Sequence, residues 1–113
     1  MIQISDLSVT SGVGVSLLRN ISLQFHPGTL HAIVGPNGSG KTTLLRTVCQ
    51  LQRSSSGSVD VDGTNADSLT PIELAKKVSW TESEHTTAFA YTAQDIILWG
   101  RWPIHQGTPT NED

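Results

Sequence analysis

Cysteine, long apolar runs and clustered basic residues are all scarce in this chain, and each shortage argues against a class of protein. The 113 residues contain one cysteine, Cys49, so no disulfide can form within the chain and a reducing compartment, the cytoplasm, is favoured. No apolar run approaches the roughly 20 residues of a membrane-spanning helix. The formal charge is -3 at pH 7 and the basic residues are scattered, so we expect no nucleic acid partner.

Aromatic residues and histidines are also few, and their positions favour structural roles. We expect the three tryptophans to supply apolar mass in a core or interface, not a platform on which bases stack. The four histidines are His26, His31, His85 and His105, and no two of them have the spacing of zinc ligands. A chain of 113 residues has room for one domain, or for part of one.

One glycine-rich segment carries most of the functional information. It matches the phosphate-binding loop pattern G-x-x-x-x-G-K-[ST] in full. Its residues are Gly35, Pro36, Asn37, Gly38, Ser39, Gly40, Lys41, Thr42 and Thr43.

Each residue type in this segment suits the binding of a triphosphate. Gly35, Gly38 and Gly40 allow positive φ and carry no Cβ, so backbone N–H groups can curl around phosphate oxygens. Lys41 places a mobile cation where the β and γ phosphates would lie, and the Thr42 hydroxyl suits a phosphate-bound Mg²⁺. A helix starting near Gly40 adds free N–H groups and a positive dipole end. The segment therefore predicts a site for a nucleoside triphosphate and Mg²⁺.

The flanking sequence supports this interpretation. The apolar run Leu30–Val34 predicts a buried parallel strand that leads into the glycines. Leu44, Leu45, Val48 and Leu51 recur at helical spacing after the loop. The order strand, loop, helix is the context in which the pattern binds phosphate.

The rest of the chain alternates between strand and helix patterns. Apolar alternation predicts strands over residues 2–9, with a slip in phase after Ile4, and over residues 15–25, followed by a Pro27-Gly28 turn. Residues 58–62 predict a half-exposed strand ending in an Asp62-Gly63 turn. Further expected elements are a helix over 71–77 with a Thr70–Glu73 capping box, a strand over 78–81, a helix from Thr92 that stops at Gly100, and a frayed end over 106–113.

The loop and its surroundings resemble the nucleotide-binding domain of ABC transporters. The resemblance rests on residues 35–46, on Ile21–Leu23 and Pro27-Gly28 before the loop, and on Ser56–Gly63 after it. It covers most of the chain, from about Ile2 to Pro103. The stretch Phe89–Pro103 is similar to the matching stretch in importers of iron siderophores, haem and cobalamin.

The resemblance implies both a fold and a function. The fold is α/β, a P-loop NTPase, with residues 1–113 forming the N-terminal part of an ABC ATPase domain: an antiparallel β subdomain plus part of the parallel core sheet. Such a domain binds ATP and Mg²⁺ between two copies and drives an integral-membrane permease from the cytoplasmic face of the membrane. Gly35 to Thr43 would hold the phosphates, with Lys41 at the β and γ phosphates, Thr42 at Mg²⁺ and Thr43 near the α phosphate.

The chain also departs from the family pattern. Ser83, between Glu82 and Glu84, stands where members usually carry glutamine, and Thr10–Ser16 contain no aromatic to stack on adenine, which leaves Val13 or Val15 to substitute. The Leu-Ser-Gly-Gly-Gln signature, the acidic Walker B strand with its catalytic glutamate and the switch histidine do not occur in residues 1–113. We therefore expect no catalytic residue in this chain.

Two other functions remain open on the sequence. One is a catalytically inactive, truncated nucleotide-binding or interaction module that contacts the permease or a full-length subunit. The other is a small P-loop kinase or GTPase, although the Asn-Lys-x-Asp motif by which GTPases read the base is absent.

Overall fold

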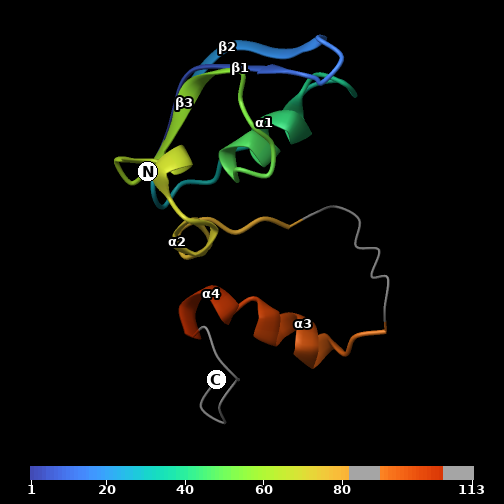
Figure 1. Ribbon diagram of the computed structural model, residues 1–113, viewed down its shortest axis with the longest axis vertical. Helices are drawn as coiled ribbons and strands as arrows, with labels where there is room; N and C mark the ends of the chain where they lie inside the picture. Colours follow the sequence, from blue (N-terminus) through green and yellow to red (C-terminus); the bar gives the residue numbers. More distant parts are fainter. Residues whose placement is uncertain (82–89, 106–113) are drawn as a thin grey trace. The chain divides into compact units, whose positions relative to one another are not determined.

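An antiparallel sheet covered by a helix forms the first of the two units of the chain, Met1–Thr70 (Figure 1). The second unit is Pro71–Asp113, and each unit is described by itself. The computed structural model describes residues 1–81 and 90–105. The sheet has the strand order β2-β1-β3-β4. In the first unit the elements are β1 (Ile2–Thr10), β2 (Ser16–Phe25), α1 (Lys41–Val48), β3 (Ser56–Val61), β4 (Thr64–Asn65) and the 3₁₀ helix η1 (Ala66–Ser68).

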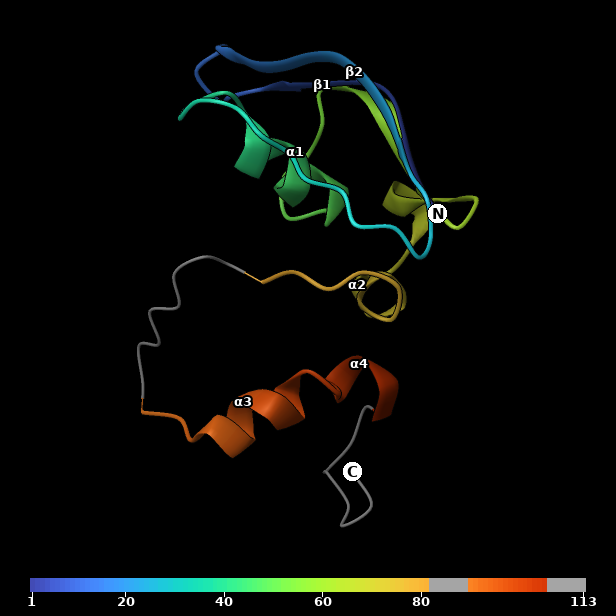
Figure 2. The ribbon, with the colours of Figure 1, turned by 180° about the vertical axis from the view of Figure 1, so that it is seen from behind.

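Helix α1 lies against one face of the sheet, as both views of the ribbon show (Figures 1 and 2), and the core of this unit is built from the two layers. Apolar side chains from both layers are shielded from water, and burial of each valine, leucine or isoleucine contributes roughly 1.5–3 kcal/mol. The buried apolar residues of the unit are Ile4, Leu7, Val9, Leu18, Leu44, Val48, Val59, Val61 and Ala66. Of the expected apolar positions on the helix, Leu44 and Val48 are buried, whereas Leu45 is exposed and Leu51 lies beyond the last turn.

The predicted slip in phase along the first strand is confirmed, and the structure shows its cause. Ile4 and Leu7 are three residues apart and yet both buried, because an extra residue in β1 shifts the register between them. Asp6 sits in this bulge with φ of 48°. Its backbone N–H donates to the Ser22 hydroxyl (2.9 Å), and that hydroxyl donates back to the Asp6 carboxylate (3.2 Å). The serine thus holds the bulge from the neighbouring strand.

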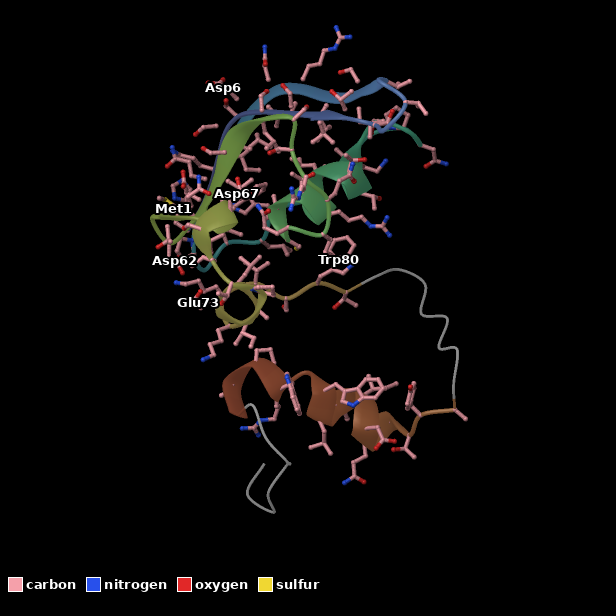
Figure 3. All side chains as sticks on the ribbon, viewed as in Figure 1. Met1, Asp6, Asp62, Asp67, Glu73 and Trp80 are labelled. Carbon is pink, nitrogen blue, oxygen red and sulfur yellow. The ribbon has the colours of Figure 1, made fainter. Side chains whose placement is uncertain are left out.

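The chain's amino terminus is tied to the turn between β3 and β4 (Figure 3). The Met1 ammonium donates to the Asp62 carboxylate over 2.6 Å, and the Asp62 N–H donates to the Met1 carbonyl over 2.8 Å. Asp62 and Gly63 both have positive φ, 51° and 77°, as the expected Asp-Gly turn requires. The turn prediction is confirmed.

The expected strand over residues 30–34 is wrong for this structure. Those residues adopt no regular structure, and Leu30 and Val34 are 100% and 88% exposed. A parallel strand exists only where a neighbouring strand supplies hydrogen bonds, and no described strand pairs with this segment. The segment therefore has the apolar pattern of a strand but no partner among the described residues.

The second unit contains three described helices: α2 (Pro71–Ala75), α3 (Ala93–Trp99) and α4 (Trp102–His105). The helix beginning at Pro71 is confirmed but ends two residues earlier than expected. The strand predicted over 78–81 is wrong, again because no described strand pairs with it. The helix ending at Gly100 is confirmed. Ser83, its neighbours Glu82 and Glu84, and the expected frayed end at 106–113 lie outside the described residues.

Helix α4 was not predicted. Gly100 ends α3 in a right-handed conformation, φ of −60°, instead of the left-handed one that usually turns the chain away. The chain therefore resumes a helix at Trp102. Pro103 is tolerated because it lies in the first turn, where a missing N–H breaks no helical hydrogen bond.

None of the helices in the described part of the chain is long and apolar enough to cross a membrane.

The capping box at the start of α3 forms as the sequence predicts. The Asp95 N–H donates to the Thr92 hydroxyl (3.2 Å), while that hydroxyl (2.6 Å) and the Thr92 N–H (2.9 Å) donate to the Asp95 carboxylate. The side-chain hydrogen bond, and after it the backbone one, lowers the pKa of Asp95 below its ordinary value. The charged carboxylate therefore stabilises α3 above the unfolded-state pKa, and this contribution is lost as pH falls through the folded-state pKa.

Replacing Thr92 by valine should raise the pKa of Asp95 part of the way back to its ordinary value, because the hydroxyl donor is removed and the backbone donor stays. A carboxyl-carbon NMR titration measures this shift. Thr92→Ser keeps the hydroxyl and serves as the control. An unchanged pKa in Thr92→Val would contradict the hydrogen-bonding account.

Candidate functional site

The nine residues of the phosphate-loop motif form an exposed turn followed by the first turn of α1. Gly38 and Gly40 adopt φ of 81° and 91°, the left-handed conformation expected of them. Gly35 is not among the residues with positive φ, so that expectation is wrong for this position. A Cβ at this position would lie 2.9 Å from the Ser39 hydroxyl, which can rotate away, so this contact alone does not require glycine. The Ser39 N–H donates to the Pro36 carbonyl (3.3 Å) across the turn.

Lys41 closes the loop on itself. Its ammonium donates to the carbonyls of Gly35 (2.9 Å) and Pro36 (2.8 Å), at the start of the loop. An ammonium has three donors, so one remains for a ligand once these two bonds are made. The side chain is half-buried. The positive charge is therefore held over the turn and not extended into solvent.

The start of α1 completes an anion-binding arrangement. Gly40 caps the helix without a side-chain hydrogen bond, and the first turn contains no acidic residue. The first N–H groups of a helix have no acceptor within it and lie at the positive end of its dipole. Thr42 is exposed in this turn and Thr43 is half-buried. Backbone donors, a fixed cation and a hydroxyl thus converge on one short segment, which suits a polyphosphate.

Sequence reasoning missed the residues on which this loop rests. A Cβ at Gly40 would lie 2.6 Å from Leu18 Cδ2 and 3.2 Å from the Leu17 carbonyl oxygen, both on β2. In the sequence, Leu18 is only one of several apolar residues in the strand predicted over residues 15–25. No local signal links it to a glycine 22 positions later.

The other candidate residues do not join this site. Val13 and Val15, at the β1–β2 turn, are 87% and 57% exposed. His31 contacts Thr29 and the Phe25 ring. Cys49 is half-buried, and this burial raises the pKa of its thiol. Within residues 1–81 and 90–105, no three His, Cys, Asp or Glu side chains are grouped so as to hold a metal ion.

Comparison with known proteins identifies the family. The profile described as ABC transporter matches residues 18–110, a range that includes the whole loop. The chain belongs to the ABC transporter family. This confirms the resemblance, and the antiparallel sheet with its helices is consistent with the N-terminal part of a P-loop ABC domain.

Several of the family members similar to this chain are named for iron or haem uptake. The hemin import ATP-binding protein HmuV of Methylobacillus flagellatus is 39% identical over 87% of this chain. The petrobactin import ATP-binding protein YclP of Bacillus subtilis is 33% identical over 100% of it, and the ferric enterobactin transport ATP-binding protein FepC of Escherichia coli 34% identical over 87%. The chain spans 36%, 44% and 36% of the lengths of these relatives.

A solved structure gives the same fold. An ATP-bound bacterial Atm1-family ABC exporter superposes with a TM-score of 0.62 and 25% sequence identity. The match covers 65% of this chain and 13% of the exporter chain. The fold class predicted from the sequence is therefore confirmed, although the strand over residues 30–34 is not formed.

Proposed function

We propose that residues 35–43 bind the phosphates of ATP together with Mg²⁺. The observation that carries the proposal is the position of Lys41, whose ammonium bonds two loop carbonyls beside the uncapped start of α1. A cation and several backbone N–H groups aimed at one place bind a multiply charged anion far better than a neutral ligand.

The members of the loop take distinct roles in this proposal. Lys41 contacts the β and γ phosphates, the loop N–H groups surround them, and Thr43 lies near the α phosphate. Thr42 supplies an oxygen ligand to Mg²⁺, which fits its exposed position in the first turn. Mg²⁺ commonly keeps several waters and takes its other ligands from phosphate and one or two protein groups.

Calorimetric titration with ATP–Mg²⁺ and with AMP tests this site. We expect ATP to bind at least about tenfold more tightly, because AMP lacks the phosphates that Lys41 and the loop contact. Equal affinities would contradict the assignment, since recognition would then rest on the nucleoside.

We further propose that the protein is the ATP-binding subunit of an importer for haem, a siderophore or a related compound such as cobalamin. The support is the names of the relatives, each an ATP-binding protein of haem or siderophore import. Its partners would be a membrane permease and a second copy of the nucleotide-binding domain, at the inner face of the cell membrane. Loss of haem or siderophore uptake on disruption of the gene, restored by the wild-type gene but not by Lys41→Ala, is the expected result.

The alternative, a catalytically inactive module, shares the phosphate site and differs only in turnover. Residues 1–113 by themselves should bind ATP without releasing phosphate, because we expect no catalytic residue among them. Ordinary phosphate release by the purified chain, abolished by Lys41→Ala, would contradict both this expectation and the inactive module.

A further inference from the structure

The phosphate loop rests on the sheet at Gly40. Of the three loop glycines, Gly38 has open space around a Cβ position, and Gly35 would meet only Ser39 of the loop itself. Gly40 would meet Leu18 Cδ2 at 2.6 Å and the Leu17 carbonyl at 3.2 Å. Because Gly40 is the cap of α1, β2 lies against the residue from which the free N–H groups of the helix start.

A bulge in β2 turns Leu18 toward this contact. Leu7 pairs with Ile21 and Val9 with Leu18, so between these pairs one residue of β1 faces two of β2. In a regular strand Leu18 and Ile21 would point to opposite faces, and the extra residue returns them to the same one. Leu18 is consequently buried, at 8% exposure.

The bulge is held by Asn20 and Ser8. Asn20 has φ of 48°, its N–H donates to the Ser8 hydroxyl (3.1 Å), and that hydroxyl donates to the Asn20 side-chain oxygen (3.3 Å). The arrangement repeats that of Asp6 and Ser22 on the other strand. The bulge in the sheet thus accounts for the inward direction of the Leu18 side chain.

We propose that Leu18 is a positioning residue for the phosphate loop. Its side chain, turned inward by the bulge, fixes Gly40 and with it the direction of the first N–H groups of α1. The proposal rests on the proposed function for the identity of the ligand, ATP–Mg²⁺. A loop held in its binding geometry before the ligand arrives loses less entropy on binding, so affinity depends on the strand below it.

Three variants test the proposal by ATP–Mg²⁺ titration at a temperature where each is folded. Leu18→Ala should weaken binding by about tenfold, since small misplacements of a site have effects of this order or larger. Ile4→Ala removes the same number of carbons from a core residue that pairs with Leu23 and Val59, and should leave affinity within about twofold. Leu18→Met nearly conserves the side-chain volume and should keep the wild-type affinity. Unchanged affinity in Leu18→Ala, or an equal loss in Ile4→Ala, would overturn the proposal.

A second measurement needs no nucleotide and separates this proposal from the proposed function. The unfolding free energy is measured for Gly40→Ala in the wild-type and Leu18→Ala backgrounds. Gly40→Ala should destabilise less when Leu18 is trimmed, because the alanine methyl then has room, while Gly38→Ala should have the same effect in both backgrounds. If the wild-type protein bound no ATP, the proposed function would be refuted. The comparison of unfolding free energies would still test the contact between Leu18 and Gly40. If Gly40→Ala lowered the unfolding free energy equally in both backgrounds, the positioning role of Leu18 would be refuted.

Discussion

Alanine at position 41 is expected to lower the affinity for ATP–Mg²⁺ by about ten- to hundredfold, the equivalent of roughly 1.5–3 kcal/mol for charge-assisted contacts. Two effects contribute. The ammonium that faces the phosphates is lost, and so are its hydrogen bonds to Gly35 and Pro36, which close the loop. Isothermal titration calorimetry on the folded variant measures the change.

Two further variants make this prediction specific to the charge. Lys41→Met keeps an unbranched apolar stem in the half-buried position, and it should lose about as much affinity as Lys41→Ala. Lys76→Ala removes an exposed lysine just after α2 and should leave the affinity unchanged. Binding by Lys41→Ala at wild-type strength would refute the assignment of the loop.

Alanine at position 57 is expected to destabilise the sheet by about 2–4 kcal/mol, the sum of a left-handed backbone penalty and steric crowding. Gly57 has φ of 84°, and a Cβ there would lie 2.5 Å from the carbonyl oxygens of Ser5 and Asp6. These are backbone atoms of the β1 bulge, so no rotamer change relieves the clash. The bulged strand would have to move away from β3.

Gly63→Ala provides the matched control. Gly63 has a similar φ of 77° but nothing within 4 Å of a Cβ, so its replacement should show the backbone penalty alone, about 1–2 kcal/mol. Urea unfolding followed by far-ultraviolet circular dichroism measures both. Tryptophan fluorescence is unsuitable, since Trp80, Trp99 and Trp102 all belong to the second unit. Equal destabilisation by the two variants would contradict the proposed crowding at Gly57.

Structure that depends on neighbours along the chain could be predicted from the sequence. The Asp62-Gly63 turn and the Thr92–Asp95 capping box are confirmed because each is made by residues within four positions of one another. The positive φ at Gly38 and Gly40 is confirmed for the same reason. The phosphate loop is a local motif of this kind, which is why the sequence predicted a nucleotide site before the fold was known.

Features that need a partner distant in sequence were decided by the tertiary structure. Residues 30–34 and 78–81 carry strand patterns but have no described strand beside them, so periodicity alone misled. The bulges at Asn20 and Asp6 depend on serines 12 and 16 positions away, which no local pattern reveals. The contact of Leu18 with Gly40 likewise joins a strand to a loop through space. The sequence by itself predicted which residues contact phosphate. Packing of the bulged sheet against α1 decided how the end of the loop is held, because only non-local contacts can orient one element against another.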